Sequence, residues 1–230
     1  MKRPLPWRET RDPYAILVSE VMLQQTQAAR VVPYFERFLG AFPTARQLAD
    51  AEPADVLRHW SGLGYNRRAL SLQRAAQHVA THGWPEDLSD LPGVGPYTAA
   101  AVASFAFGAN LAAVDTNYKR VVRRHGSGPP PTPQTNQAMM ELGATVCTAR
   151  RPRCSACPVE ASCAKRPDPD APRRRGVRFE ETDRYLRGRT VAALLSGGTP
   201  PPGAERVLAG LERDGLVIRG DDGQPALPRR

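Results

Sequence analysis

Every cysteine of the chain lies in one short stretch, "CTARRPRCSACPVEASC", at residues 147–163. The four thiols belong to Cys147, Cys154, Cys157 and Cys163, in the spacing C-x6-C-x2-C-x5-C. Four thiolates that converge from one compact loop are suitable ligands for a soft metal centre. A zinc ribbon usually combines two C-x-x-C pairs from separate places, whereas this stretch has a single pair. The spacing therefore favours a [4Fe–4S] cluster over a zinc ion, and it leaves unligated thiols as the remaining alternative.

The first loop of this stretch carries three arginines, Arg150, Arg151 and Arg153. Guanidinium groups on a loop that a metal centre holds in fixed geometry are well placed to contact phosphate oxygens. A solvated basic loop is the simpler interpretation. The functional hypothesis is that the metal centre presents these arginines to a polyanion.

Two acidic residues lie in contexts that suit acid–base chemistry. Glu20 has Ile16, Leu17 and Leu23 at helical spacing around it. An apolar environment favours the protonated form of a carboxyl, so Glu20 is a candidate general acid; the alternative is an ordinary glutamate at the edge of the core. Asp115 precedes "TNYKRVV" and is a good helix N-cap. A capping carboxylate held by backbone N–H groups stays ionised, as a group that stabilises a cation must.

The segment "LPGVGPYTAAAV" at residues 91–102 is a candidate phosphate-binding hairpin. Gly93, Val94 and Gly95 form a tight turn in which backbone N–H groups approach a ligand closely, and Pro96 opens the next helix. A plain helix–helix corner has a similar sequence, so the hairpin is weak evidence by itself.

The net charge of +9 favours an anionic partner, with nucleic acid ahead of an anionic membrane. No apolar stretch follows the basic start of the chain, and "AAAVASFAFGA" at 99–109 is shorter than the roughly 20 residues of a membrane span. We therefore expect a cytoplasmic protein without a membrane partner. Clustered thiols in a reducing compartment are again consistent with a metal centre.

The elements that must position these residues are helices. No strand alternation persists before residue 180, so we expect an all-α main body. The expected helices are 14–32 (stopped near Pro33), 34–42, 48–64, 67–83, a short one before the hairpin, one from Pro96, one after Asp115, and 136–147. Residues 126–135 are predicted to form a Pro/Gly/Ser loop.

We expect a main domain at 1–165, a linker at 166–176 and a small C-terminal appendage at 177–230. The appendage is predicted to contain two amphipathic helices, 184–196 and 204–216, followed by a hairpin. This α+β arrangement is similar to part of a winged helix.

Several of these stretches resemble the helix–hairpin–helix DNA glycosylases, and specifically the MutY-type adenine glycosylases. The stretches are "LPWR" (5–8), "SEVMLQQTQ" (19–27), "VVPYFERF" (31–38), "GLGY" (62–65), "VDTNYKRV" (114–121) and "NQAMMELGA" (136–144), with the hairpin and the cysteine stretch. The resemblance covers roughly residues 5–165, and the motifs occur in the order of the family.

The resemblance implies a two-lobed all-α enzyme, with a six-helix barrel and a lobe that binds a [4Fe–4S] cluster. It also implies double-stranded DNA with a mismatch or oxidised base as the partner, and hydrolysis of the N-glycosidic bond of adenine opposite 8-oxoguanine or guanine. We expect a bacterial, nucleoid-associated monomer. The target base must leave the stack before it reacts.

By the same resemblance, Glu20 protonates N7 of the displaced adenine and Asp115 stabilises the sugar cation. Tyr97 and Asn117 fall on positions that support that cation. Such a pair of carboxyl groups is also what glycoside hydrolysis requires.

Five further positions carry roles by resemblance. Gln25 and Tyr65 fall on residues that wedge into the duplex, and Gln137 falls where the family contacts the adenine. Trp7 and Arg8 lie at the edge of the pocket.

Relatives that also nick the strand place a Schiff-base lysine at the position of Tyr97, and this chain has no lysine between Lys2 and Lys119. We therefore predict a monofunctional glycosylase. The sequence departs from the family at Thr116, where a glycine is usual, and in the shortened segment 126–135. The appendage is also too short for the Nudix-like domain that reads 8-oxoguanine in many members.

Three rival functions remain, one of which is a basic electron-transfer protein that would need a redox partner but not the Gly93–Gly95 hairpin. A thymine or uracil mismatch glycosylase shares most of these motifs. A non-catalytic iron–sulfur DNA-binding module would keep the hairpin and the cysteines without needing Glu20 and Asp115.

Overall fold

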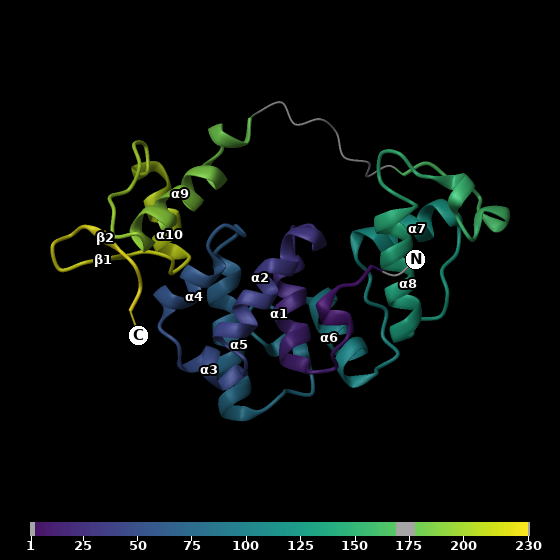
Figure 1. Cartoon of the computed structure of the whole chain (residues 1–230), viewed down its shortest axis with the longest axis horizontal. Coiled ribbons are helices and arrows are strands. Elements are labelled where there is room, and N and C mark those ends of the chain that lie inside the picture. The colour runs from purple at the N-terminus through teal and green to yellow at the C-terminus, as the bar shows by residue number, and fades with distance from the viewer. Residues whose placement is uncertain (1–2, 169–177, 230) are drawn as a thin grey trace. The chain divides into compact units, whose positions relative to one another are not determined.

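The computed structural model describes residues 3–168 and 178–229, and Figure 1 labels its main elements. The α-helices are α1 (Pro13–Leu23), α2 (Ala28–Ala41), α3 (Ala45–Asp50), α4 (Pro53–Trp60), α5 (Arg67–His82), α6 (Pro96–Phe107), α7 (Thr116–His125), α8 (Pro133–Thr145), α9 (Asp183–Leu195) and α10 (Glu205–Arg213). Short 3-10 helices are η1 (Pro6–Arg8), η2 (Leu88–Asp90), η3 (Cys154–Ala156), η4 (Glu160–Ser162) and η5 (Phe179–Glu181), and the strands are β1 (Ile218–Arg219) and β2 (Pro225–Ala226). The all-α main body and the small α+β appendage are confirmed.

The chain forms two compact units, each built from two stretches of sequence. One unit combines residues 1–16 with 95–174, and the other combines 17–94 with 175–230, so that the boundary falls inside α1. The linker predicted at 166–176 lies mostly outside the described residues. The division into a main domain, a linker and an appendage stays a prediction.

In the unit of residues 17–94 and 175–230, aromatic side chains form the centre of the core. Phe38 on α2 is fully buried and packs edge-on against Trp60 of α4, with ring centroids 5.8 Å apart. The Trp60 indole N–H donates to the Gly64 carbonyl over 3.1 Å, so its polar end is satisfied. This core fixes the Gly62–Tyr65 loop that follows α4.

The single helix expected over 14–32 is wrong, because the chain breaks between Leu23 and Ala28. Gln25 has a φ of +59°, in the left-handed region that ends a right-handed helix. Pro33, the expected stop, lies inside α2. Proline removes one hydrogen bond of a helix, and buried α2 side chains such as Phe35 offset that loss.

Two further boundaries differ from expectation. The helix expected over 48–64 is divided into α3 and α4 at Ala51, because the residues before Pro53 are restricted to extended backbone. The loop expected to run to residue 135 ends earlier, because α8 begins at Pro133. Thr132 caps α8 and forms a reciprocal capping box with Thr135.

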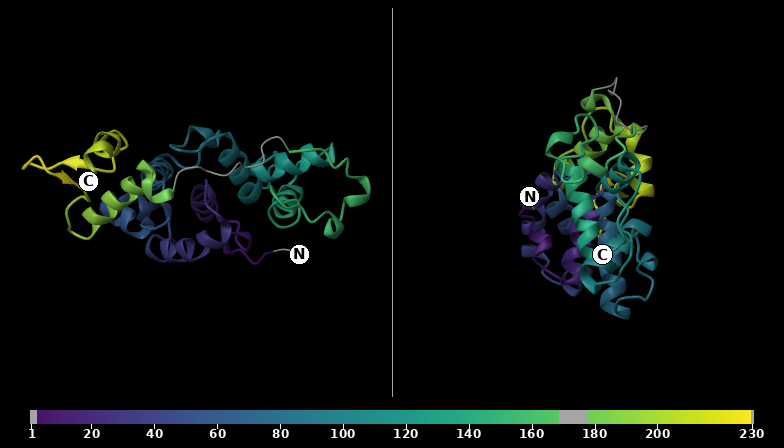
Figure 2. Two further views of the ribbon diagram at one scale, coloured as in Figure 1. Left: turned by 90° about the horizontal axis from the view of Figure 1, so that it is seen from above. Right: turned by 90° about the vertical axis from the view of Figure 1, so that its right-hand side faces the viewer.

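In the unit of residues 1–16 and 95–174, α7 packs against α8 (Figures 1 and 2). Tyr118, Val121 and Met139 form the buried contact. A Cβ atom at Gly143 of α8 would lie 2.6 Å from Cβ of Asn117, so glycine is required where the two helices meet.

The appendage consists of η5, α9, α10 and a short antiparallel hairpin. Ile218 pairs with Ala226 and Arg219 with Pro225. Thr182 caps α9, and its hydroxyl accepts from the Tyr185 N–H. Within the described residues, no helix is long and apolar enough to cross a membrane.

Candidate active site and metal centre

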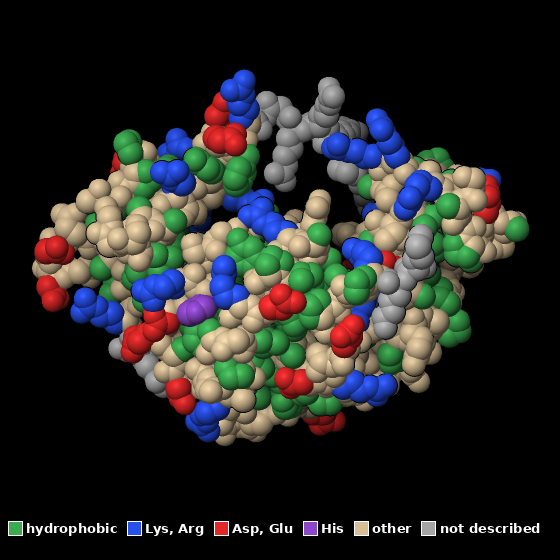
Figure 3. Space-filling view, in the orientation of Figure 1, with side chains coloured by type: hydrophobic (Ala, Val, Ile, Leu, Met, Phe, Trp, Pro, Cys, Tyr) green, Lys and Arg blue, Asp and Glu red, His purple; other side chains and the backbone are tan. Residues whose placement is uncertain are grey.

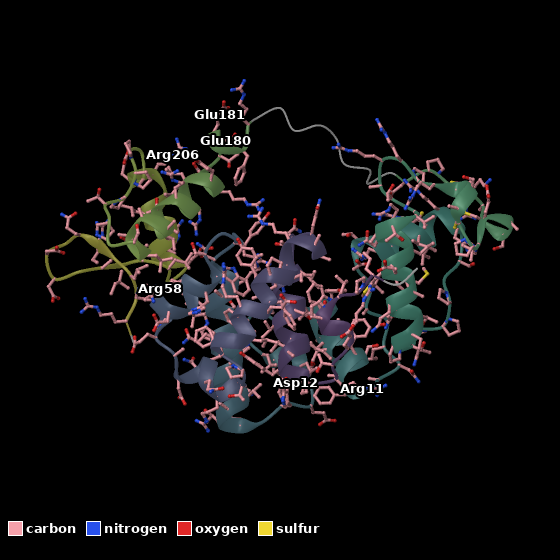
Figure 4. All side chains as sticks on the ribbon, viewed as in Figure 1. Arg11, Asp12, Arg58, Glu180, Glu181 and Arg206 are labelled. Carbon is pink, nitrogen blue, oxygen red and sulfur yellow. The ribbon has the colours of Figure 1, made fainter. Side chains whose placement is uncertain are left out.

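Glu20 lies in the middle of a buried helix. Asp12 begins α1 by accepting hydrogen bonds from the N–H groups of Tyr14 (3.1 Å) and Ala15 (3.3 Å), and Figure 4 labels it at this end. Every residue from Tyr14 to Met22 is buried, and Glu20 itself is only 4% exposed. Since carboxyl groups are seldom buried without a reason, the environment expected for Glu20 is present.

Asp115 caps α7 as predicted, and both of its carboxylate oxygens accept hydrogen bonds. Oδ1 accepts from the Tyr118 N–H over 2.6 Å, and Oδ2 accepts from Nδ2 of Asn117 over 2.8 Å. Asp115 is partly exposed, so its carboxylate is both fixed and accessible. The structure therefore brings two of the predicted catalytic residues, Asp115 and Asn117, into direct contact.

A second row of polar contacts connects Asn117 to the cysteine stretch. The Arg120 Nη2 donates to Oδ1 of Asn117 over 2.6 Å and to the Gly143 carbonyl over 2.7 Å. Its Nε donates to the Cys147 carbonyl over 2.7 Å. Arg120 is only 8% exposed, so one buried guanidinium joins the Asp115 region to the first cysteine. Sequence reasoning missed Arg120; its periodicity with Asn117 on one helix face is the only signal for it.

Asn136 is a second residue that sequence reasoning missed. Its side chain is fully buried and donates to the Leu111 carbonyl (2.6 Å) and to the Ser104 hydroxyl (3.0 Å), and it accepts from the Ala113 N–H (3.3 Å). The Ala113 carbonyl in turn accepts from the Asp115 N–H over 3.2 Å. The segment that ends at Asp115 is therefore clamped by one buried amide. The signal was present in the "NQAMMELGA" stretch, next to Gln137.

The two residues assigned to the wedge share an unusual backbone. Among the described residues, only three other than glycine have a positive φ, and two of them are Gln25 (+59°) and Tyr65 (+51°). Such conformations cost free energy and persist where the surrounding structure enforces them, often at functional sites. Gln25, Tyr65 and Gly93 also line one cavity, so the structure brings these predicted DNA-binding positions together.

Arg68 enforces both conformations, and sequence reasoning did not identify it. Its Nη1 donates to the carbonyls of Val21 (2.8 Å), Met22 (2.8 Å) and Gln24 (2.6 Å), which end α1. Its Nη2 donates to the Gly64 carbonyl (2.9 Å), beside Tyr65. Burial lowers the pKa of Arg68 to about 10, so this guanidinium stays charged near neutral pH.

The hairpin forms the predicted tight turn. Gly93 has a φ of +79°, and a Cβ atom there would lie 2.6 Å from Cβ of Ser71 on α5. Val94 is buried and its N–H donates to the Leu91 carbonyl over 3.0 Å, whereas Gly95 is exposed and precedes α6. The backbone of the turn is therefore anchored on one side and open on the other.

The remaining predicted positions lie in the unit of residues 1–16 and 95–174. Tyr97 on α6 and Gln137 on α8 are half-buried. Trp7 is 8% exposed, and Arg8 donates to Oε2 of Glu141 over 2.7 Å. Although burial alone would raise the pKa of Glu141, hydrogen bonds from Arg3 and Arg8 hold it below its usual value. Arg8 is thus held in an ion pair within this unit.

The four cysteines surround one cavity of about 180 Å³, and no disulfide joins them within the described chain. The Lys165 N–H donates to Sγ of Cys163 over 3.4 Å, and Nη1 of Arg124 lies 3.6 Å from Sγ of Cys147. Four thiols around a shared space, with N–H donors directed at two sulfurs, fit an iron–sulfur cluster. No group of three or more His, Cys, Asp or Glu in the described part of the chain converges as one metal ion would need.

The three arginines of the cysteine loop have different surroundings. Arg150 and Arg151 are exposed. Arg153 donates instead to the Thr145 carbonyl at the end of α8 and lines the cysteine cavity. Arg124, which sequence reasoning missed, organises the loop by donating to the carbonyls of Thr148 (2.7 Å) and Ala149 (2.9 Å).

Comparison with known proteins agrees with this arrangement. Residues 18–145 match the HhH-GPD superfamily of base excision DNA repair proteins. Residues 147–163 match the iron–sulfur binding domain of endonuclease III. The adenine DNA glycosylase of Mycobacterium tuberculosis is 43% identical, in an alignment covering 98% of this chain and 89% of the relative. The chain belongs to the adenine DNA glycosylase family.

Other adenine DNA glycosylases agree. The enzyme of Mycolicibacterium smegmatis is 41% identical, over 98% of this chain and 92% of the relative. The human enzyme is 43% identical, over 72% of this chain and 37% of its own length. The mycobacterial alignment spans 272 positions, more than the 230 residues of this chain, so these glycosylases carry residues that it lacks.

Solved structures with the same fold are DNA repair enzymes. A thermostable thymine-DNA glycosylase has a TM-score of 0.64 and 30% identity, covering 71% of this chain and 88% of that one. A non-covalent endonuclease III–DNA complex has a TM-score of 0.61 and 25% identity, covering 68% and 85%. The helix–hairpin–helix glycosylase fold and a DNA substrate are thereby established for this family member.

As a member of this family the protein carries a [4Fe–4S] cluster, and Cys147, Cys154, Cys157 and Cys163, which surround one cavity, are the residues that would hold it. When bound, it supplies a rigid centre that fixes the surrounding loop. The zinc alternative is set aside, because the matched family binds an iron–sulfur cluster.

Proposed function

We propose that this chain hydrolyses the N-glycosidic bond of adenine paired with 8-oxoguanine or guanine in duplex DNA. The observation that carries the proposal is the presence of two carboxyl groups in different surroundings: Glu20 is 4% exposed within α1, and Asp115 is partly exposed and accepts hydrogen bonds at both oxygens. Acid-assisted departure of a base needs a proton donor and an anion that stabilises the sugar cation.

Glu20 protonates N7 of the displaced adenine, which turns the base into a better leaving group. Its burial supports this role, because a carboxyl in an apolar environment holds its proton more readily.

Asp115 stabilises the positive charge that develops on the sugar as the bond breaks. Its two hydrogen bonds, from Tyr118 and Asn117, fix the carboxylate before the reaction, so that little reorganisation is needed in the transition state. Tyr97 supports the same cation, and Gln137 contacts the base.

Gln25 and Tyr65 enter the duplex and help to displace the adenine, while backbone N–H groups of the Gly93–Gly95 hairpin hold a phosphate. Positive φ values at Gln25 and Tyr65 support this role, because they place side chains at the tips of two rigid loops. Arg150 and Arg151 contact the DNA backbone.

The enzyme acts as a monofunctional monomer in the bacterial nucleoid. Tyr97 stands where strand-nicking relatives have a lysine, so water rather than a protein amine captures the sugar. The product is an intact strand with an abasic site.

The test is single-turnover excision from matched duplexes that contain A:8-oxoG, A:G, T:G or U:G. We expect rates in the order A:8-oxoG, then A:G, with no measurable product from T:G and U:G. The 30% identity to a thymine-DNA glycosylase makes T:G the informative competitor. Faster excision from T:G than from A:8-oxoG would overturn the assignment of adenine.

A further inference from the structure

The appendage and residues 17–94 enclose a cavity of about 870 Å³ within one compact unit. Its volume falls in the range of ligand-binding sites, roughly 300–1,000 Å³. The cavity contains Gln25, Tyr65 and Gly93, but much of its remaining wall comes from η5 and α9 of the appendage. The family resemblance assigns no role to those two elements.

Charge in this cavity is strongly one-sided. Six arginines line it, against a single acidic residue, Asp214. Asp214 is engaged by two of them, because Arg187 pairs with its Oδ2 and Arg67 lies 3.5 Å from its Oδ1. Lys and Arg side chains are distributed over the face of the molecule shown in the space-filling view (Figure 3). The excess of positive charge suits a polyanion.

Arg184 and Arg189 are the cations of α9 that remain available. Both are exposed, and neither has a carboxylate partner in the described part of the chain. The Arg184 guanidinium lies 3.8 Å from the centre of the Tyr65 ring and 5.5 Å from that of Phe179. The appendage thus brings a cation directly onto the side chain that enters the duplex.

Aromatic surface adjoins these cations. Phe179 is 48% exposed and packs edge-on against Tyr185, with centroids 5.5 Å apart. An exposed aromatic ring of this kind offers a flat surface on which a nucleobase can stack. Glu180, labelled with Glu181 on η5 in Figure 4, lines a smaller neighbouring cavity, whose wall also includes Tyr185 and Arg189.

We propose that this cavity binds one unpaired nucleotide of the DNA that Gln25 and Tyr65 unstack. The base stacks on Phe179, which Tyr185 supports edge-on, and Arg184 and Arg189 hold the flanking phosphates. Aromatic platforms combined with a basic groove are the general solution for binding single-stranded nucleic acid. The inference rests on the proposed function, because it places the site beside the wedge of a DNA glycosylase.

The test measures equilibrium binding of an eight-nucleotide oligothymidylate to the full-length protein with its cluster intact, at several salt concentrations. The variants are Arg184→Ala, Arg184→Lys and Phe179→Ala. The matched control is Arg213→Ala, which removes the same charge from an exposed position of α10 outside the cavity. Thermal unfolding of each variant confirms that it folds.

We expect Arg184→Ala to weaken binding about tenfold and to lower the salt slope by about 0.7, the value for one phosphate contact on a single strand. Arg184→Lys keeps the salt slope but still loses affinity, because lysine lacks the planar stack on Tyr65. Phe179→Ala weakens binding at least about fivefold with no change in slope. Arg213→Ala stays within twofold of the parent protein.

Equal affinities for the parent protein, Arg184→Ala and Phe179→Ala would overturn the proposal. So would an equal loss in Arg213→Ala, which would mean that overall charge rather than the cavity drives binding. Because the readout is binding, it does not depend on excision. If the protein excises adenine but fails this binding test, only the proposal for the cavity is overturned. If it passes the binding test but does not excise adenine, only the proposed function is overturned.

Discussion

The regions around Glu20 and Asp115 each contain a carboxyl group, but they differ in its burial and in its position on the helix. Glu20 is surrounded by buried side chains of α1, including Ile16 and Leu17. Asp115 instead lies at the start of α7, where Tyr118 and Asn117 donate to it directly. Glu20 lies within a buried helix, whereas Asp115 lies partly exposed at the end of a helix and accepts hydrogen bonds at both of its carboxylate oxygens. The difference teaches that one protein can place two similar carboxyl groups in very different surroundings, one buried and one partly exposed at a helix cap.

The largest expected effect is that of Glu20→Gln, which keeps the shape of the side chain and removes the acidic proton of its carboxyl group. We expect single-turnover excision of adenine to fall by about 10²- to 10⁴-fold, the usual contribution of a general acid. The control is Glu36→Gln, at an exposed position of α2, which should leave the rate unchanged. An unchanged rate in Glu20→Gln would show that Glu20 is not the general acid.

Asp115→Asn tests the other carboxyl group. Asparagine caps helices as well as aspartate does, so α7 should remain intact, while loss of the negative charge should slow excision about 10²- to 10³-fold. The matched control, Asp12→Asn, makes the same change at the cap of α1. Equal effects at both positions would show that capping, not charge, is what matters.

Arg68→Met extends the comparison, because Arg68 makes directed hydrogen bonds in the unit that contains Glu20. Its loss leaves the carbonyls that end α1 without their donor, at a cost of about 1.5–3 kcal/mol in unfolding free energy. We also expect duplex binding to weaken about tenfold, since the Gln25 and Tyr65 loops are no longer fixed. Arg74→Met, at an exposed position of α5 outside the cavity, serves as the control in urea unfolding and in binding. Equal behaviour of the two variants would contradict this role.

Asn136→Ala probes how far the hydrogen bonds around Asp115 extend. The substitution leaves the Leu111 carbonyl and the Ala113 N–H unsatisfied, which should cost about 1–3 kcal/mol and slow excision about tenfold. Asn110→Ala, exposed in the same segment, is the matched control. A stability loss with a normal excision rate would restrict Asn136 to folding.

The smallest expected effect is that of Glu141→Gln on the unfolding free energy at acidic pH. The pKa of Glu141 is lower in the folded protein than in the unfolded chain, so its contribution is complete above the unfolded pKa and is lost as pH falls through the folded value. Glu141→Gln should therefore flatten the loss of stability below about pH 4.5. A parallel pH dependence in variant and parent, measured by urea unfolding, would contradict the ion pair with Arg8.

Much of the fold was predictable because its signals are local. Asp12 and Asp115 cap helices through their own side chains, and Gly83 ends α5 with a φ of +80°. The breaks near Gln25 and before Pro53 were missed for different reasons. Pro53 carries a local signal that a continuous apolar pattern obscured, whereas the break at Gln25 depends on Arg68, more than 40 residues away.

Part of the site was predictable for the same reason. Residues with exceptional types, such as Glu20 in an apolar helix or the four cysteines, stand out in the sequence. Three other residues do not stand out: Arg120, Asn136 and Arg68. Each donates hydrogen bonds to backbone carbonyls that come within reach only when the chain folds. Charge and hydrophobic periodicity do not identify such contacts; for Arg120 they show only that it shares a helix face with Asn117.

The most direct test of the central claim is single-turnover cleavage of an A:8-oxoG duplex, analysed with and without alkali, on protein with its cluster intact. The account predicts an abasic product whose strand breaks only after alkali, formed at a rate that Glu20→Gln lowers by about 10²- to 10⁴-fold. Strand cleavage without alkali, or no product despite tight duplex binding, would contradict it.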